Sequence, residues 1–569
     1  MNYTSNSKIF LTASDILVKS SKYVNVTNVI TFFLSLGTIS FLYLHFKLRR
    51  NVRLFKKLTN NEIPVKTQYF DFLAYPVLNA MIPEFLRGSK KNWKYQENCY
   101  EPYANTKHET ICLVTPFSFF LDTANPSFIK QVTSNSVDFP KPVHIYQAIN
   151  VYGPNIVGTE GSEYKRHRKI AAPQFSESNN MLVHKVTNDT LLQMFASWEK
   201  TVDANSESRV KVSHNMSKLT LSVFSAAGFG KVLDWEKFEE LIPKNHTTSY
   251  STAVTNVAKN LILFVITPKF LLKSWIPLFK SVKENLDEFS LYMKDLIQEA
   301  NFTLKSEKIR DSESKKNDNN LLKRFVAASE QIDLNSGEEA YKDKYMSVDE
   351  LKKATPLTEA ELVSDLFVLV FAGFDTTAGT LNATFTILAE HPDIQENIHK
   401  EATALFGNGL PSYDLLSSLH YTNAVIHEIL RMYPPVAEIP KWSTKEQPLG
   451  PVTIPENTII TIHTMALQRS PKLWENPEKF NPARFLNEDG TFNNKMENTL
   501  TVFSKGQRAC LGKQFAKVEM LFTLALISQR YTWRLPDDLD KNINIKEISQ
   551  ELTHKFKHTV DLMFKKRTQ

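Results

Sequence analysis

Two patterns of apolar residues alternate along the chain and predict a mainly α-helical protein with small β-sheets. Residues 161–433 and 511–530 repeat apolar positions every three to four residues, as helices with one buried face do. Residues 58–160 and 441–500 carry short alternating runs and many turn residues, which is typical of short strands joined by turns. The helices should therefore form the bulk of the molecule.

A hydrophilic stretch, residues 305–356, interrupts the helical region. It is rich in Lys, Ser, Asp, Asn and Glu, which cannot bury enough apolar surface to fold tightly. The sequence therefore predicts a solvated loop there, around a short helix near 321–329. No internal repeat and no Gly/Ser-rich linker divides the sequence, and this favours one large domain.

The best-defined helix should run from Thr358 to His391. Thr358 and Glu361 have the spacing of a capping box, and Pro392 follows directly after the segment. Apolar residues occupy nearly every side of this segment, so a helix about 48 Å long should cross the interior of the domain.

Near the middle of that helix, residues 372–377 read Ala-Gly-Phe-Asp-Thr-Thr. A glycine, an acid and two β-branched alcohols are each locally unfavourable in a helix interior. The threonines could simply donate to preceding backbone carbonyls, with Asp375 paired in the core. The alternative is a chemical role for Asp375 and Thr376.

An almost uncharged segment, residues 29–46, lies close to the N-terminus. As a helix it would be about 27 Å long, enough to cross a thin bilayer. The basic run that follows places its C-terminal side in the cytosol. We expect a short lumenal N-terminus (1–28), a single-pass transmembrane signal anchor (29–46), a basic cytosolic linker (47–64) and a cytosolic catalytic domain (65–569). A cleaved signal peptide and a buried core helix are the alternatives.

Composition narrows the partners and the kind of site. The 569 residues carry 68 Lys and Arg against 61 Asp and Glu, a net charge of +7. Without a recognisable nucleic-acid motif, this modest excess suggests a membrane surface or an acidic protein partner rather than nucleic acid. Asn2 and Asn25 begin glycosylation sequons on the expected lumenal side. Cys99, Cys112 and Cys510 are too few and too scattered for a disulfide framework or a CxxC zinc site.

Cys510 lies in the run Phe-Ser-Lys-Gly-Gln-Arg-Ala-Cys-Leu-Gly, residues 503–512. Gly506 and Gly512 lack a Cβ, so the backbone can turn sharply there and approach a flat partner closely. A helical pattern begins directly after the cysteine, and amides at a helix N-terminus stabilise a thiolate, the form that ligates metals. Arg508 could hold a carboxylate in a bidentate fork. Taken alone, the cysteine could equally be structural.

The order F-x-x-G-x-R-x-C-x-G resembles the heme-thiolate loop of the cytochrome P-450 family. A chance match in a chain of this length is on the order of one in several thousand. The resemblance implies that Cys510 is the axial ligand of the iron in heme b, that Arg508 pairs with a propionate and that Phe503 shields the sulfur, with Gly506 at the turn. It also implies the cytochrome P-450 fold from about residue 65 onwards.

The run 372–377 is similar to the oxygen-activation segment of the same family. By that similarity, Gly373 lets heme and O2 approach the helix. Thr376 would donate a hydrogen bond to the oxygen under activation, and Asp375 would relay protons.

Two further segments support the resemblance. Residues 161–169 resemble the heme-contact helix of the family, with Arg168 on a propionate and Tyr164 where Trp is usual. Glu428, Arg431 and Arg484 resemble the buried Glu-Arg-Arg network of the family, which would have a structural role behind the cysteine loop.

These resemblances imply a monooxygenase, similar to fungal microsomal members, that inserts one atom of O2 into an apolar or aromatic organic substrate. Since no flavin or NADPH domain is recognisable, electrons from NADPH should come through NADPH-cytochrome P-450 reductase, docking near Lys505 and Lys513. Cytochrome b5 is a second candidate donor, and the anchor implies the endoplasmic reticulum membrane. A heme-thiolate isomerase or dehydratase, a phenol-coupling enzyme and a non-catalytic heme sensor are the alternatives.

Overall fold

The computed structural model describes most of the chain. The described residues are 26–69, 99–237, 242–260, 263, 267, 271–309, 320–329, 356–407, 409, 411–549 and 553–568. The predicted sequons at Asn2 and Asn25 and most of the hydrophilic stretch 305–356 lie outside these residues.

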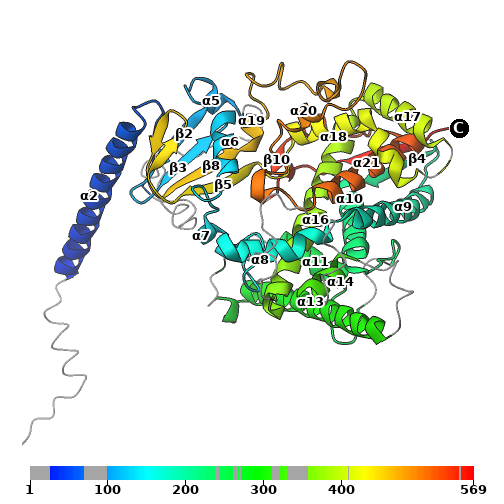
Figure 1. Ribbon diagram of the computed structural model, residues 1–569, viewed down its shortest axis with the longest axis horizontal. Helices are drawn as coiled ribbons and strands as arrows, with labels where there is room; N and C mark the ends of the chain where they lie inside the picture. Colours follow the sequence, from blue (N-terminus) through cyan, green and yellow to red (C-terminus); the bar gives the residue numbers. More distant parts are fainter. Residues whose placement is uncertain are drawn as a thin grey trace, which may run out of the picture.

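Helices form the larger part of the body, as the sequence predicts (Figure 1). The principal ones are α8 (Gly161–Ala171), α9 (Glu177–Glu199), α10 (Val212–Val223), α11 (Tyr250–Lys259), α13 (Pro277–Ile309), α14 (Leu321–Ser329), α16 (Glu359–Leu388), α17 (Pro392–Phe406), α18 (His420–Met432) and α21 (Lys513–Arg530). Shorter ones include α5 (Glu101–Ala104), α6 (Pro126–Ser134), α7 (Val143–Tyr146), α19 (Thr464–Leu467) and α20 (Asn494–Glu497).

The long helix α16 crosses the middle of this bundle and contacts α10, α13, α18 and α21. Its predicted capping box is confirmed, because the Thr358 hydroxyl accepts from the Glu361 amide and the Glu361 carboxylate accepts from the Thr358 amide. Most of its side chains are buried on all sides, as expected for a helix that other helices surround.

Five short strands form a sheet at one side of the helices (Figure 1). Their order is β1 (Val65–Thr67), β2 (Thr110–Val114), β3 (Phe119–Thr123), β8 (Thr458–His463) and β5 (Glu438–Ser443). β3 pairs with β8 in parallel, so the two strand-rich regions of the sequence meet in one sheet. The smaller sheets are β4 (Glu207–Lys211), β12 (Asp561–Lys566) and β9 (Tyr531–Arg534); β6 (Gln447–Leu449) and β7 (Val452–Ile454); and β10 (Ile548–Ser549) and β11 (Lys555–Phe556).

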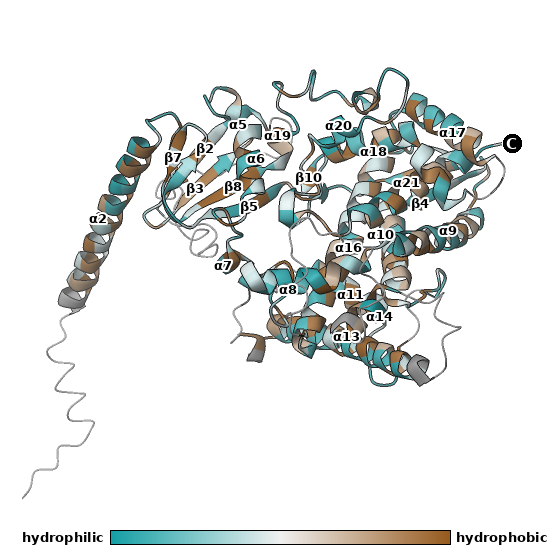
Figure 2. Ribbon diagram, in the orientation of Figure 1, coloured by the Kyte–Doolittle hydropathy of each residue, from teal (hydrophilic) through white to brown (hydrophobic). Residues whose placement is uncertain are grey.

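The N-terminal helix α2 (Val26–Leu58) projects from the sheet side of the body (Figure 1). Two helices in the described part of the chain are long and apolar enough to cross a membrane, Ile30–Leu58 and α16. The apolar window of α16 is 72% buried, whereas none of the window in Ile30–Leu58 is buried. Figure 2 shows this contrast as brown residues along a helix that stands away from the body. The exposed helix is therefore the candidate anchor.

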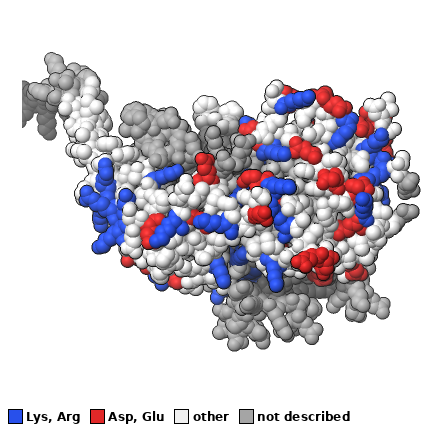
Figure 3. Space-filling model, turned by 90° about the horizontal axis from the view of Figure 1, so that it is seen from above, with Lys and Arg blue, Asp and Glu red and all other residues white. Residues whose placement is uncertain are grey.

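The basic segment 47–64 packs partly on the body of the protein. The helix continues through it to Leu58, and Leu48 and Phe55 are buried against the five-stranded sheet. Val52 lies between them at helical spacing and packs on the same cluster, so one apolar face docks while the basic residues stay outside. Figure 3 shows basic side chains gathered on the side of the body from which α2 projects.

Candidate functional site

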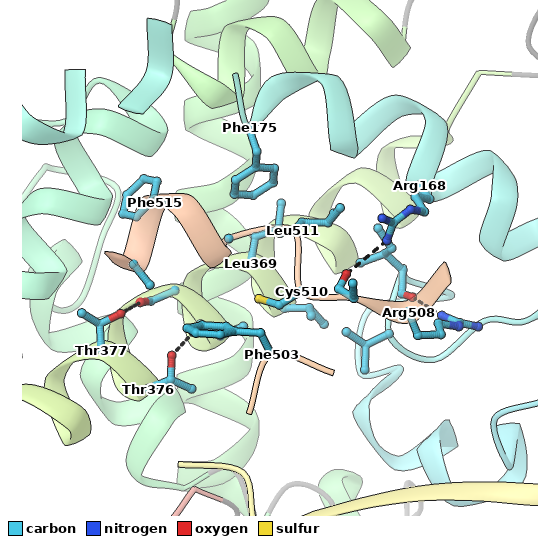
Figure 4. Close-up of a pocket in the computed structure, with 18 of the residues that line it drawn as sticks. Arg168, Phe175, Leu369, Thr376, Thr377, Phe503, Arg508, Cys510, Leu511 and Phe515 are labelled. Carbon is cyan, nitrogen blue, oxygen red and sulfur yellow. Dashed lines mark hydrogen bonds between the residues drawn. The ribbon is translucent and has the colours of Figure 1, made fainter. Parts of the chain in front are cut away.

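A pocket lies between α8, α16 and the loop that leads into α21. Among the residues that line it are Tyr164, Arg168, Gly373, Thr376, Phe503, Arg508 and Cys510, all of which the sequence predicts for the site. Figure 4 shows Cys510, Phe503 and Arg508 arriving from the loop, and Thr376 and Thr377 from α16. Residues more than 100 positions apart in the sequence thus form one site.

The cysteine loop folds back on itself, because the amide of Cys510 donates to the carbonyl of Phe503 at 2.8 Å. Gly506 opens the turn η7 (Gly506–Arg508) with a φ of +67°. A Cβ at this position would lie 2.5 Å from the carbonyl oxygen of Thr133 in α6. The close approach to α6 therefore requires a glycine here, and Gly506 itself is not among the residues that line the pocket.

The side chain of Cys510 is open to the pocket, although protein surrounds it. Burial raises the pKa of this thiol, and the amide of Gly512 and the cations Arg168 and Lys513 offset the effect only in part. The amide at the start of the helix lowers the pKa of the thiol, as predicted, but this effect alone is too weak to favour a thiolate. A metal ion bound to the sulfur would supply the missing positive charge.

Thr376 and Gly373 bring α16 to the pocket wall. The Thr376 hydroxyl donates to the carbonyl of Ala372 at 2.8 Å, the local bond expected of a mid-helix threonine. A Cβ on Gly373 would lie 2.3 Å from the ring of Phe224, in the turn η3 (Phe224–Gly228). The glycine thus makes room for an aromatic ring that forms part of the pocket lining, a packing reason that the sequence analysis missed.

Asp375 does not line the pocket, although it is next to Thr376 in the sequence. Its carboxylate accepts from the Thr553 hydroxyl at 2.6 Å and from the Lys555 ammonium at 2.5 Å, and Asp375 is 6% exposed. Successive residues of a helix point about 100° apart, so the acid and the alcohol occupy different sides of α16.

Tyr164, Arg168 and Arg508 come together at one wall of the pocket. The Arg508 guanidinium lies 3.2 Å from the centre of the Tyr164 ring. Arg168 donates to the Tyr164 hydroxyl at 3.0 Å, and that hydroxyl donates to the carbonyl of Gln507. Tyr164 therefore links α8, the predicted heme-contact helix, to the cysteine loop.

Three charged residues near this wall were not predicted from the sequence: Lys141, which lines the pocket, and Glu160 and Lys441, which do not. Arg508 donates to Glu160 at 2.7 Å, and the amide of Lys141 donates to the same carboxylate at 2.9 Å. Burial and the nearby Arg508 lower the pKa of Lys141 to about 7. Burial likewise lowers the pKa of Lys441 to about 8. The negative charge of Glu160 favours the charged form of Lys441, but burial and the positive charge of Arg508 outweigh it. The sequence signal for the two lysines is their position, because Lys141 lies between two prolines and Lys441 between a proline and a tryptophan.

The three residues of the predicted Glu-Arg-Arg network contact one another and do not line the pocket. Arg431 and Glu428 are completely buried and form two hydrogen bonds, at 2.7 and 2.9 Å. Arg484 lies 3.4 Å from the same carboxylate, which also accepts from the amide of Asn481 at 2.8 Å. Mutual pairing is what makes such buried charges tolerable.

These features fit an iron porphyrin. A thiol in an apolar pocket can ligate the iron, and the basic side chains Lys141, Arg168 and Arg508 in the pocket lining match the negative propionates. The fold and the pocket are thus consistent with a helical heme-binding protein.

The comparisons with known proteins identify the family. A family model described as Cytochrome P450 matches residues 120–560. A Postia placenta protein, Cytochrome P450 monooxygenase 124, is 29% identical over 81% of this chain and 83% of its own length. Cytochrome P450 monooxygenase prx9 of Penicillium rubens is 24% identical over 92% of this chain and 95% of its own. The crystal structure of the cytochrome P450DA heme domain aligns with a TM-score of 0.64 and 18% identity, over 89% of this chain and 97% of that chain.

The chain belongs to the cytochrome P450 family. It is a P450 monooxygenase, an oxidoreductase that uses heme iron, O2, a small-molecule substrate and a redox partner.

Proposed function

We propose that this P450 is anchored in the endoplasmic reticulum membrane by α2 and inserts one oxygen atom into an apolar or aromatic organic substrate. One observation carries the proposal: the thiol of Cys510 and the hydroxyl of Thr376 line the same apolar pocket from two different elements. This arrangement suits an iron ligand and a proton-donating alcohol that act on one oxygen molecule.

In this proposal the cofactor would be heme b, and the sulfur of Cys510 would ligate its iron. Tyr164, Arg168 and Arg508 would hold the propionates, helped by the buried cation Lys141. Cys99 and Cys112 are buried in other clusters, and the sequence has no C-x-x-C-H run for covalent attachment. Bound heme supplies O2 binding and O–O cleavage, which a thiolate ligand favours.

The chain's own residues would guide protons and exclude water. Val368, Leu369 and Phe515 give the pocket an apolar lining, which keeps competing water from the reacting atoms. The Thr376 hydroxyl would exchange its bond to Ala372 for a bond into the pocket, and thereby hold a proton at Oγ1. Asp375 would supply that proton from the far side of α16.

Electrons would come from NADPH through a separate NADPH-cytochrome P450 reductase, with cytochrome b5 as a second candidate. Lys505 belongs to the cysteine loop and Lys513 directly follows it, with its ammonium 2.8 Å from the carboxylate of Glu497. A positive surface near the ligand would attract an acidic donor protein.

The direct test uses the full-length protein, isolated with heme and reconstituted with reductase. A substrate panel is first screened by binding difference spectra, and hits are turned over under ¹⁸O2. One ¹⁸O atom per product is expected. Conversion that needs neither NADPH nor O2 would instead favour an isomerase or dehydratase, and ring coupling without ¹⁸O would favour a phenol-coupling enzyme.

The ligand assignment has its own test. Cys510→Ser should abolish the red-shifted Soret band of the ferrous–CO complex, because a hydroxyl is a poor substitute for a thiolate. Cys99→Ala and Cys112→Ala are matched controls that should keep the band. A Cys510→Ser protein with an unchanged band would refute the assignment.

A further inference from the structure

Glu497, the last residue of α20, joins that helix to the start of α21. Its Oε1 lies 2.8 Å from the Lys513 ammonium and 3.3 Å from the Lys517 ammonium, both in the first two turns of α21. Nε2 of His427 in α18 lies 3.5 Å from the same oxygen. Three basic side chains from two helices therefore converge on one carboxylate oxygen.

This cluster is largely withdrawn from water. The side chain of Glu497 is 12% exposed, that of Lys517 is 14% exposed and that of Lys513 is 37% exposed. Burial opposes the charge on Glu497, but His427, Lys513 and Lys517 outweigh that effect and hold the pKa of this carboxyl well below its usual range. Charges in such a site act over longer distances than charges on an open surface, because less water and salt screen them.

Lys513 connects the cluster to the cysteine loop. It follows Cys510 by three positions, and its ammonium lies 5.8 Å from the centre of the Phe503 ring, which lines the pocket. Burial raises the pKa of the Cys510 thiol, and the positive charge of Lys513 is one of the influences that oppose this rise. Glu497 determines how much of that charge reaches the sulfur, since a carboxylate in contact with an ammonium offsets its field at longer range.

Other contacts hold the segment that carries Glu497 in place. The side chain of Asn493 caps α20 at its N-terminus. Phe492 and Leu500, on either side of α20, are buried in a shared cluster, and Met496 packs against that cluster. A change of charge at Glu497 therefore need not displace the segment, and the electrostatic role of this acid can be separated from a structural one.

We propose that Glu497 is a positioning residue that lowers the reduction potential of the iron held by Cys510, an inference that rests on the proposed function. Glu497 fixes the ammonium groups of Lys513 and Lys517 and offsets one of their two charges. The single electron that the reductase delivers converts ferric to ferrous iron and adds one negative charge at the site. Each positive charge nearby that is not offset therefore favours the ferrous form.

The test is a cycle of charge changes in the full-length holoenzyme in lipid nanodiscs. Each protein is equilibrated with a redox dye, without reductase or substrate, and the ferrous-to-ferric ratio is read at one fixed potential. Glu497→Gln should raise this ratio about threefold, a modest effect because Lys513 is partly exposed. Lys513→Met should lower it by a similar factor. The double variant has the wild-type net charge and should return the ratio close to the wild-type value.

Two exposed residues near Glu497 in the sequence provide matched controls. Glu488→Gln and Lys495→Met make the same changes of charge in contact with solvent, and both should leave the ratio unchanged. A lower midpoint of urea denaturation in Glu497→Gln with an unchanged ratio would show a structural staple and overturn the proposal. A double variant that keeps the full shift of Glu497→Gln would overturn it as well, because offset charges require a return.

Lys513→Met decides the question alone if Glu497→Gln does not retain heme. This variant keeps the bond between Glu497 and Lys517, so α20 and α21 stay joined. A lower ferrous-to-ferric ratio would support the proposal, and an unchanged ratio would overturn it.

The ferrous–CO spectrum of the same samples separates this inference from the proposed function. If the wild type shows the red-shifted Soret band and the ratio does not respond to Glu497→Gln, only the role of Glu497 is overturned. A wild type without that band would contradict thiolate ligation of the iron, and the role of Glu497 would fall with it.

Discussion

His167 Nδ1 and Asp365 Oδ2 lie 2.6 Å apart, and both side chains are completely buried. His167 belongs to α8, next to Arg168, and Asp365 belongs to α16, about three turns before Thr376. Asp365 also accepts from the amide of Ile156 at 2.7 Å. This pair therefore fixes the helix that carries Arg168 against the helix that carries Thr376.

Asp365→Asn should destabilise the protein by about 3 kcal/mol, because one half of a buried pair is left without its partner. It should also speed heme loss, since Arg168 moves with α8. Chemical denaturation and transfer of heme to an apo-globin acceptor measure the two effects. Glu163→Gln, on the exposed face of α8, is the control; equal heme loss in both variants would argue against the role of the pair.

Glu361 predicts a pH dependence of stability. Burial opposes its charge, but hydrogen bonds from Arg166 and Thr358 outweigh that effect and lower its pKa from 4.5 to about 2. A carboxyl whose pKa is lowered by folding stabilises the protein above its unfolded pKa, and this contribution is lost as the pH falls towards the folded value.

The wild type should therefore exceed Glu361→Gln in unfolding free energy by about 2 kcal/mol at pH 7. The difference should shrink below about pH 5, as the unfolded-state carboxyl becomes protonated. Urea denaturation of both proteins between pH 7 and 3 measures it. A constant difference across this range would contradict the explanation.

Thr376→Ala should uncouple oxygen use from product formation. O2 consumption should continue, while product per O2 falls about tenfold or more and peroxide takes its place, because proton transfer is no longer guided. Thr380→Ala is the control, since its hydroxyl is bonded to the Thr376 carbonyl at 2.9 Å and does not line the pocket. Unchanged coupling in Thr376→Ala would remove this hydroxyl from the mechanism.

Two truncations should separate the anchor from the docked half of α2. Removal of residues 1–44 should release the protein from membranes and leave heme binding intact. Removal of residues 1–57 takes Leu48 and Phe55 from the core and should cost a further 3 kcal/mol or so of stability. Carbonate extraction and thermal unfolding report the two effects, and equal stability of the truncated proteins would show that this half is dispensable.

Local sequence determined much of the architecture and part of the site. The capping box at Thr358, the helix over Leu321–Ser329 and the turn around Gly506 depend on residues close together in the chain, so their spacing alone predicts them. The order of residues around Cys510 likewise identifies a loop that can ligate iron.

Only the tertiary structure decided the surroundings of these residues. It buried Phe55 under the sheet, placed the Phe224 ring against Gly373, and brought Lys141 to Glu160 and Arg508. It also turned Asp375 towards Lys555, 180 residues away. Such contacts join residues far apart in the sequence, and their energy depends on burial and charge that arise only when the elements pack. The sequence therefore predicts Asp375 to be a partner of Thr376, whereas in the folded protein Asp375 is a partner of the C-terminal hairpin β10–β11.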